Sequence, residues 1–349
     1  MGGKGGKEFH EGLASGARRS IVLPSCVEVF MRFTVFILLL FLCACAGKPP
    51  GTERVSFATA SPRWLDEVGG PTLKQVKGRG YLILPQQKGA APVPAVIVLH
   101  SSLGVGSLEW DFAKRILAQG QAILLVDSFK GRGIDKITDD QMAVSEVSIL
   151  NDLYAAQRYL LRWPEIDRDR IAVAGLSKGA LPALYSAFPS IHRRYGYQND
   201  PFRSHLAFYP WCGLTLKDLR LSGRPVQIHS GGADEITPAA LCETLVQKVK
   251  AVRPKAPLNL YVYPGQGHGF THPALHDLSL PVGYPYPRDC RIAEQADGRF
   301  VELSSGQVLS GRNLSAVIGA CSDKGAWVEG HGGAGAEAYE RALAFLAGP

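Results

Sequence analysis

Three residues of the sequence could together carry out nucleophilic acyl transfer. Ser177 lies in the run Gly175-Leu176-Ser177-Lys178-Gly179, a G-x-S-x-G pattern, and Asp234 and His268 follow it in the chain. A serine hydroxyl becomes an effective nucleophile when a neighbouring imidazole accepts its proton. A carboxylate then fixes the imidazole tautomer and stabilises the imidazolium. The three residues therefore qualify as nucleophile, base and orienting acid.

The segments around Ser177 predict the strand, turn and helix that a nucleophile elbow requires. Residues 171–174 form a short apolar run, and an apolar helical pattern follows through Leu184 and Ala187. The serine of such an elbow has a strained backbone, and a Cβ two residues to either side would collide with the neighbouring strand or helix. The two glycines of the pattern meet this steric demand. A simple glycine-serine turn in an α/β protein is the competing interpretation.

Asp234 and His268 each lie in a loop that follows a predicted strand, 225–230 and 258–263 respectively. Ligands of open α/β sheets bind at the carboxyl ends of the strands, so both side chains fall at the functional edge. The order Ser, Asp, His is that of α/β-hydrolases. Two simpler interpretations stay open. Asp234 could only cap the helix that begins near Pro238, with Glu235 as the acid, and His268 could only cap a turn.

The oxyanion that forms during acyl transfer needs two backbone N–H donors. The residue after the nucleophile, Lys178, is expected to supply one of them. The loop after the apolar strand 94–100 is expected to supply the other, from Ser102.

We predict neither a cofactor nor a metal. The segment Gly104-Val105-Gly106 begins like a dinucleotide fingerprint, but Glu109 stands where the third glycine should be. His268, His272 and His276 recur at four-residue spacing, yet the glycines and the proline among them argue against a helix that would align them.

The order of the predicted elements indicates an α/β fold. Strands are expected at 78–85, 94–100, 121–127, 171–174, 205–210, 225–230 and 258–263, and helices at 108–119, 139–163, 238–252 and 336–347. Alternation of this kind predicts a mostly parallel central sheet with helices on both faces. The aromatic residues Trp110, Phe129, Tyr209 and Trp211 are interpreted as core residues rather than as the lining of a pocket.

The N-terminal segment 1–45 resembles an export signal. Met31-Arg32 precedes an apolar run of about ten residues, which fits a signal-peptide core better than a membrane span. Leu42-Cys43-Ala44-Cys45 resembles a bacterial lipobox, which predicts cleavage before Cys45 and lipidation of its thiol. Ordinary secretion after an Ala44-x-Ala46 site is the alternative, and Met31 is an alternative start. We expect an exported protein of the cell envelope, facing the periplasm and anchored to the membrane by lipid.

Composition fits an exported globular protein. The chain has 349 residues, is 46% hydrophobic and carries a formal net charge of +7, with no long basic run that would favour nucleic acid. Seven cysteines occur, and four of them lie beyond the N-terminal segment. An even number behind an export signal suggests two disulfides. Cys290 and Cys321 lie in a Gly/Pro-rich stretch, 273–333, which we interpret as an insertion held by their disulfide.

Several of these segments together resemble the dienelactone hydrolase family of α/β-hydrolases. They are 97–104, 126–133, 170–179, 231–238 and 263–270, and the resemblance covers about residues 76–272. It implies the α/β-hydrolase fold for 76–349 as a single domain, preceded by a tether and edge segment at 46–75. It also implies a disulfide between Cys212 and Cys242, as in exported members. The family's founding enzymes use a cysteine nucleophile where Ser177 stands, and a glutamate where Ser101 most nearly aligns.

The resemblance therefore implies a serine hydrolase that cleaves small-molecule esters or lactones through an acyl-enzyme, rather than an enzyme for dienelactone itself. A peptidase or carbohydrate esterase on the same fold is one alternative. A binding lipoprotein without catalytic activity is another, although such a protein would have no need of all three groups.

Overall fold

The computed structural model describes residues 48–71, 73–86, 91–137, 140–275, 278–283 and 285–348. The predicted signal peptide and the lipidation of Cys45 lie outside the described residues. Within them, no helix is both long enough and apolar enough to span a bilayer.

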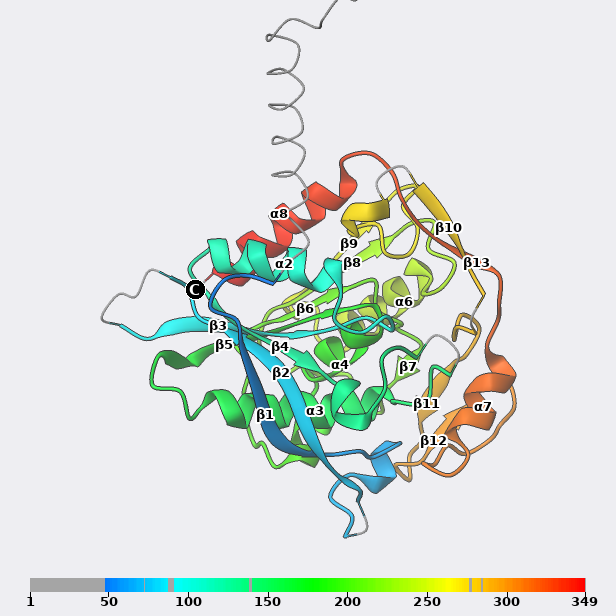
Figure 1. Ribbon diagram of the computed structural model, residues 1–349. Helices are drawn as coiled ribbons and strands as arrows, with labels where there is room; N and C mark the ends of the chain where they lie inside the picture. Colours follow the sequence, from blue (N-terminus) through cyan, green and yellow to red (C-terminus); the bar gives the residue numbers. More distant parts are fainter. Residues whose placement is uncertain are drawn as a thin grey trace, which may run out of the picture. The chain divides into compact units, whose positions relative to one another are not determined.

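An eight-stranded sheet forms the centre of this part of the chain (Figure 1). Its strands are β1 (Glu53–Ala60), β2 (Gln75–Ile83), β3 (Val93–Leu99), β4 (Ala122–Asp127), β5 (Ile166–Leu176), β6 (His205–Phe208), β8 (Val226–Gly231) and β9 (Leu258–Tyr263). They lie in the order β1-β2-β4-β3-β5-β6-β8-β9. β2 is antiparallel to β1 and to β4, and the other neighbours pair in parallel. The predicted mostly parallel sheet is confirmed.

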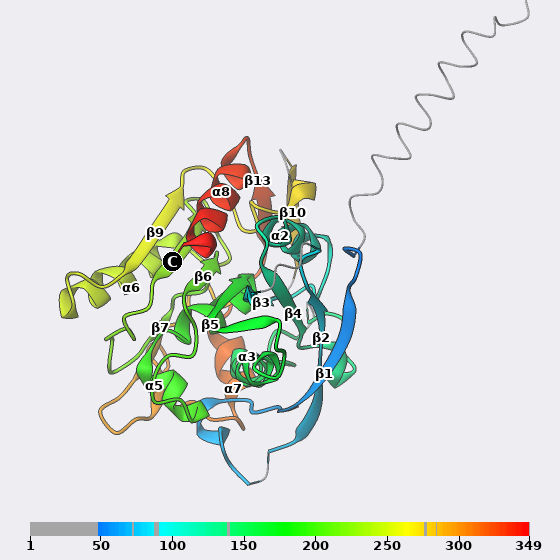
Figure 2. The same cartoon turned by 90° about the vertical axis from the view of Figure 1, so that its left-hand side faces the viewer.

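Helices cover both faces of the sheet (Figure 2). α2 (Ser107–Ala118) and α8 (Ala334–Ala347) pack on one face, and α3 (Glu146–Leu160), α4 (Ala180–Tyr185) and α6 (Ala239–Val252) pack on the other. Successive residues of β3 point to opposite faces of the sheet. Val96 and Val98 belong to the core on the side of α2 and α8, and Ile97 and Leu99 belong to the core on the side of α3, α4 and α6. Burial on both faces is the reason why the central strands are apolar without alternation.

Helix α3 begins later than the apolar spacing predicts. The prediction placed it at 139–163, but its first residue is Glu146. Ser145 has an extended backbone, and its hydroxyl accepts a hydrogen bond from the Ser148 amide, which makes it the N-cap. Val144 is buried and fits the helical spacing, but it belongs to the preceding loop.

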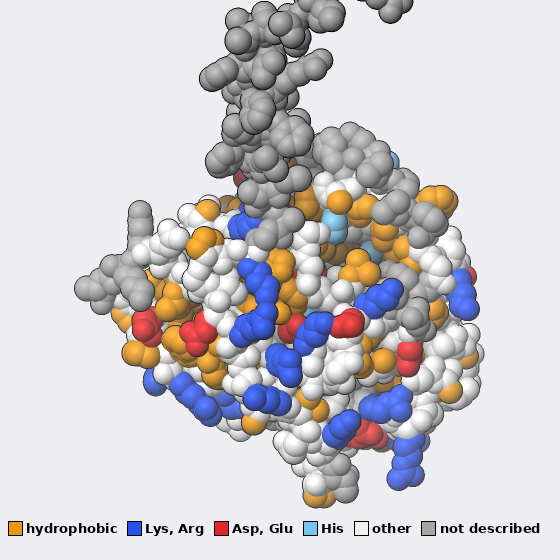
Figure 3. Space-filling view, viewed as in Figure 1, with side chains coloured by type: hydrophobic (Ala, Val, Ile, Leu, Met, Phe, Trp, Pro, Cys, Tyr) orange, Lys and Arg blue, Asp and Glu red, His pale blue; other side chains and the backbone are white. Residues whose placement is uncertain are grey.

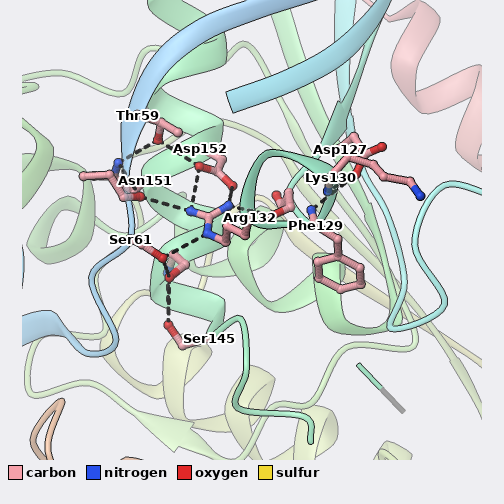
Figure 4. Close-up of polar contacts among 12 residues, drawn as sticks. Thr59, Ser61, Asp127, Phe129, Lys130, Arg132, Ser145, Asn151 and Asp152 are labelled. Carbon is pink, nitrogen blue, oxygen red and sulfur yellow. Dashed lines mark hydrogen bonds and ion pairs between the residues drawn. The ribbon is translucent and has the colours of Figure 1, made fainter. Parts of the chain in front are cut away.

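A buried ion pair fastens the edge strand β1 to helix α3 (Figure 4). Arg132 lies in the loop after β4, and its guanidinium is 2.7 Å from the Asp152 carboxylate of α3. The same guanidinium donates to the Ala60 carbonyl and to the Ser61 hydroxyl at the end of β1. Thr59 of β1 also donates to Asp152. The segment 46–75, expected to be a tether and edge segment, thus contains a strand that is firmly part of the sheet.

The stretch 273–333 forms small elements outside the eight-stranded sheet. β10 (Leu278–Val282) pairs with β13 (Ala326–Gly330), and β11 (Ile292–Glu294) pairs with β12 (Phe300–Glu302) and with β7 (Leu214–Thr215). α7 (Leu314–Cys321) lies beside them (Figure 1). The remaining short helices are α5 (Pro189–His192), η2 (Leu65–Glu67), η3 (Lys130–Arg132), η4 (Ser177–Gly179), η5 (Arg193–Tyr195) and η6 (Pro273–Leu275).

Two disulfides join parts of the chain that are distant in sequence, and they are the two that we predicted. Cys212–Cys242 ties the segment after β6 to helix α6, and Cys290–Cys321 ties the segment before β11 to the end of α7. Basic side chains are spread over the face shown in Figure 3, with acidic side chains among them.

Candidate active site

Ser177 occupies a strained turn between β5 and α4. Its φ is +52°, and among the described residues only one other non-glycine residue, Tyr209, has a positive φ. A Cβ on Gly175 would lie 2.1 Å from the Gly179 carbonyl oxygen, and one on Gly179 would lie 2.5 Å from the Leu99 carbonyl oxygen. Both glycines are therefore sterically required, for the reason that the sequence indicated. The serine hydroxyl is consequently presented beyond the end of β5.

The structure brings His268 and Asp234 to this serine. His268 Nε2 is 2.8 Å from Ser177 Oγ, and His268 Nδ1 is 2.9 Å from Asp234 Oδ2. Asp234 follows β8 and His268 follows β9, and both are buried. Because β5, β8 and β9 run in the same direction, their carboxyl ends place all three side chains at one edge of the sheet.

The two oxygens of Asp234 have different partners. Oδ1 accepts hydrogen bonds from the backbone amides of Ile236 and Thr237, 2.9 and 2.8 Å away, which closes the turn before α6. Oδ2 faces His268. The contacts expected of a cap and those expected of an orienting acid, which the sequence left as alternatives, are thus made by separate atoms of one side chain. Glu235, the alternative acid, is exposed.

Two residues that support the imidazole were not recognised from the sequence. Thr237 Oγ1 lies 2.9 Å from Asp234 Oδ2, 3.1 Å from His268 Nδ1 and 3.0 Å from the Tyr209 carbonyl oxygen. The ring of Tyr209 packs edge-on against the imidazole, with 5.0 Å between centroids. Tyr209 is a core residue, as expected, but its left-handed φ of +42° resembles the strain at Ser177. No local pattern marks either residue.

The loop after β3, which should supply one oxyanion donor, is held by a buried glutamate. Glu109 of α2 accepts from the Ser101 amide at 3.0 Å and from the Gly106 amide at 2.9 Å. The Ser101 amide is therefore engaged. Ser102 and Lys178, the two predicted donors, line one cavity together with Ser177. Their placement agrees with the predicted oxyanion hole, whose function stays a prediction.

Polar and apolar side chains share the walls of this catalytic cavity. Its lining comprises Ser102, Gln141, Glu146, Ser177, Lys178, Leu181, Trp211, Ile236, Thr237, Tyr286 and Pro287. The ammonium of Lys178 is 2.6 Å from the Glu146 carboxylate, so the positive charge beside Ser177 is neutralised. Trp211, which we interpreted as a core residue, is mostly buried but also forms part of this wall. In the described part of the chain, no cluster of three or more His, Cys, Asp or Glu side chains could hold a metal ion.

Comparison with known proteins shows where this chain belongs. The family model "Dienelactone hydrolase family" matches residues 79–297. An uncharacterized protein of Mycobacterium tuberculosis, found in two strains, is 30% identical over 188 residues, which are 50% of this chain and 63% of that protein. The chain thus matches somewhat less than two thirds of the length of these curated relatives.

Solved structures with a similar course of the chain include two hydrolases. A dienelactone hydrolase-like promiscuous phosphotriesterase from metagenomic libraries is 17% identical, with a TM-score of 0.47, covering 64% of this chain and 87% of that one. A thermophilic esterase from the Planctomycetes species Thermogutta terrifontis is 16% identical, with a TM-score of 0.46, covering 63% and 84%. The family match itself runs from within β2 to just beyond β11 and includes the loops that carry Ser177, Asp234 and His268. The fold is that of the α/β-hydrolases, and the chain belongs to the dienelactone hydrolase family.

Proposed function

We propose that the protein hydrolyses carboxylic esters or lactones, with Ser177 as nucleophile, His268 as general base and Asp234 as orienting acid. The observation that carries this proposal is the continuous chain of contacts from Ser177 Oγ through the imidazole to Asp234 Oδ2, at 2.8 and 2.9 Å. It begins at a serine that is strained into a left-handed turn and lines a cavity. Membership of the dienelactone hydrolase family supports the same reaction class.

In the proposed reaction, His268 accepts the hydroxyl proton while Ser177 Oγ attacks the carbonyl carbon of the ester. The carbonyl oxygen becomes an oxyanion, which the amides of Ser102 and Lys178 stabilise. The intermediate collapses to an acyl-enzyme, and His268 gives its proton to the departing alcohol oxygen. A water molecule, deprotonated by the same imidazole, then releases the acid and restores the serine.

The surroundings of the catalytic cavity favour an uncharged, apolar acyl group. An adjoining cavity shares Glu146, Leu181, Trp211 and Pro287 with it. The other side chains of that inner cavity are apolar or aromatic. They come from α3 and the loop before it, from α4, α5 and β7, from the insertion and from the segment before β2, and they include Val147, Leu150, Ile191, Leu314 and Ile318. The alcohol must face His268, which protonates it. Since His268 is not among the residues lining either cavity, we place the acyl group in the cavities and the alcohol outside them.

A fluorophosphonate probe tests the nucleophile. It should label Ser177 in the folded protein and leave Ser177→Ala unlabelled. Folded protein that resists the probe, or a Ser177→Ala variant that is labelled equally well, would sink the assignment. A series of p-nitrophenyl esters of increasing acyl length then tests the reaction and the acyl site. Labelling without hydrolysis of any ester in the series would point to peptides or carbohydrate esters instead.

A pair of leucines on α3 gives a matched test of the acyl site. Leu150 lines the inner cavity, whereas Leu153 is equally buried but is not among its lining residues. Either change to alanine removes the same atoms and should cost about 2–5 kcal/mol of stability. Only Leu150→Ala should shift the preferred acyl chain towards greater length. Identical profiles for the two variants would place the acyl group elsewhere.

We further propose that the protein is exported and lipidated at Cys45. The two disulfides support an oxidising compartment, in which such bonds persist. Replacing Cys45 by serine should move the full chain from the membrane fraction to the soluble fraction of expressing cells. Membrane association that survives this change would exclude the lipid anchor.

A further inference from the structure

Gln141 is clamped between the two sides of the proposed oxyanion hole. Its side-chain oxygen accepts a hydrogen bond from the Ser102 hydroxyl at 2.8 Å, and its backbone oxygen accepts one from the Lys178 ammonium at 2.7 Å. Lys178 is itself held by Glu146 at 2.6 Å. One residue of the loop before α3 is thus fixed by the side chains of both residues whose amides are expected to bind the oxyanion.

This arrangement leaves the amide nitrogen of Gln141 without a partner. Nε2 is buried, and no described residue accepts a hydrogen bond from it. Gln141 also lines the catalytic cavity beside Ser177. A buried N–H donor without an acceptor is costly, and an acceptor on a bound substrate would remove that cost. The cavity beside Ser177 therefore contains an N–H donor that has no acceptor.

The two polar side chains that hydrogen-bond to Gln141 are already engaged. The Ser102 hydroxyl donates its proton to Gln141 Oε1, and the Lys178 ammonium is paired with Glu146 and with the Gln141 carbonyl. Neither side chain can turn to a substrate without breaking these bonds. Among the side chains held at the predicted donors, the amide of Gln141 is the one whose N–H groups are free to interact with a bound ester.

We propose that Gln141 Nε2 is a third oxyanion donor. This inference rests on the proposed ester hydrolysis and adds a catalytic residue to it. As Ser177 attacks, negative charge grows on the substrate's carbonyl oxygen, and a fixed amide N–H binds this charged oxygen more strongly than the neutral carbonyl. The contact therefore lowers the barrier more than it tightens substrate binding, and it should appear in kcat rather than in KM.

The change Gln141→Glu tests the donor directly. The introduced carboxylate can still accept from Ser102, so the loop keeps its anchor, but it has no proton to donate at neutral pH. We expect kcat for a p-nitrophenyl ester to fall about 100-fold, as for removal of one oxyanion donor, with KM changed less than about threefold. At lower pH the introduced carboxyl becomes protonated and can donate. The ratio of variant to wild-type kcat should therefore rise as the pH falls towards 4.

Two further variants separate donation from folding. Gln141→Met removes the acceptor of the Ser102 hydroxyl together with the amide donor, and it should lose kcat to a similar extent, without recovery at low pH. Gln157→Met is the control: Gln157 is a buried glutamine of α3 whose side chain accepts from Tyr197, and this change should leave kcat within about twofold. A trifluoromethyl ketone, whose adduct with Ser177 carries an oxyanion, should bind each Gln141 variant more weakly in proportion to its loss of kcat/KM.

The outcomes also separate this proposal from the underlying one. A wild-type protein that neither reacts with fluorophosphonate nor cleaves esters would remove the proposed function itself. An active wild type together with a Gln141→Glu variant of unchanged kcat at pH 7 would leave the esterase intact and overturn the role of Gln141. A low kcat that does not vary with pH relative to wild type would reduce Gln141 to a positioning residue.

Discussion

The described part of the chain contains two Ser–His–Asp arrangements with nearly the same distances, and they differ in whether a substrate could reach the serine. In the first, Ser177, His268 and Asp234 are linked at 2.8 and 2.9 Å. In the second, Ser186 Oγ lies 2.9 Å from His205 Nδ1, and His205 Nε2 lies 2.8 Å from Asp200 Oδ2. The two serines stand at opposite ends of helix α4. Distance alone therefore does not identify a catalytic triad.

The serines differ in their backbone and in where their protons can go. Ser177 is strained at a φ of +52° and lines a cavity. Ser186 ends α4 with an ordinary helical φ of −62°, and its hydroxyl donates to the Ala183 carbonyl. It has no proton to offer the imidazole. Ser186 and His205 are completely buried, so no substrate can reach them.

The carboxylates differ as well. Asp200 accepts from Ser222 and from the Phe202 amide in addition to His205, so it joins β6 to the loops on either side of it. One oxygen of Asp234 accepts from a backbone amide of the turn before α6, and the other faces the imidazole of His268. The second arrangement is thus a buried polar link that stabilises the fold. The first exposes one reactive atom to a cavity, and that access is the property which function requires.

The largest expected difference concerns activity after removal of each serine hydroxyl. Ser177→Ala should lower kcat for a p-nitrophenyl ester by about 10⁴-fold or more, because the nucleophile is lost. Ser186→Ala should leave kcat within about threefold, since its hydroxyl has no part in the reaction. Initial rates per mole of folded protein provide the measurement. A Ser186→Ala loss comparable to that of Ser177→Ala would make the two arrangements functionally equivalent and refute the comparison.

Changes to the two aspartates should affect different properties. Asp234→Asn should reduce kcat by about 10⁴-fold, because the imidazole loses its orienting partner. Asp200→Asn should leave kcat nearly unchanged but lower the free energy of unfolding by about 2 kcal/mol, since a buried carboxylate that accepts three hydrogen bonds is replaced by a neutral amide. Urea unfolding of both variants, set beside their kinetics, tests the assignment. A stable Asp200→Asn variant would mean that the buried link contributes little.

The sequence predicts the first arrangement and says nothing of the second, for a physical reason. Ser177 is marked by two glycines whose missing Cβ atoms make room for the Gly179 and Leu99 carbonyls, and steric demands of this kind leave a local pattern. Asp234 and His268 are marked by their positions after strands. Ser186 and His205 occupy ordinary helix and strand positions, and only packing brings them together.

The same limit explains what else the sequence could not supply. The strand and helix order was predictable because buried parallel strands are apolar throughout and helices show a 3.6-residue period. The start of α3 was not, because Val144 continues the apolar spacing while the Ser145 hydroxyl caps the helix. Thr237 and Gln141 act through contacts with residues that are distant in the chain, and neither has a spacing that signals them.

Glycine substitutions test whether the backbone is strained at Ser177 but not at Ser186. A left-handed conformation costs a non-glycine residue about 1–2 kcal/mol, and glycine does not incur this cost. Ser177→Gly should therefore be more stable than Ser177→Ala by about 1 kcal/mol. At Ser186, which has a helical backbone, the order should reverse, with Ser186→Gly less stable than Ser186→Ala by up to about 1 kcal/mol. Thermal unfolding of the four variants decides the matter. The same order at both sites would show that Ser177 is not strained.

The smallest expected effect is the acid dependence that the buried link confers. Burial, the largest influence on Asp200, raises the pKa of its carboxyl, but attraction to His205 and hydrogen bonds from His205 and Ser222 outweigh it. The pKa of Asp200 therefore lies below its ordinary value of 3.8. In the unfolded chain this carboxyl takes up a proton first as the pH falls, so acid favours unfolding. The stability that Asp200 contributes is complete above about pH 4 and is lost as the pH falls from there through the folded-state pKa.

Asp200→Asn cannot titrate, so its free energy of unfolding should fall less steeply below pH 4 than that of the wild type. Asp169→Asn, at an exposed position, serves as the control and should follow the wild type. Urea unfolding at several pH values between 3 and 5 measures these slopes, and equal slopes for Asp200→Asn and wild type would show that the buried aspartate does not govern this acid limb.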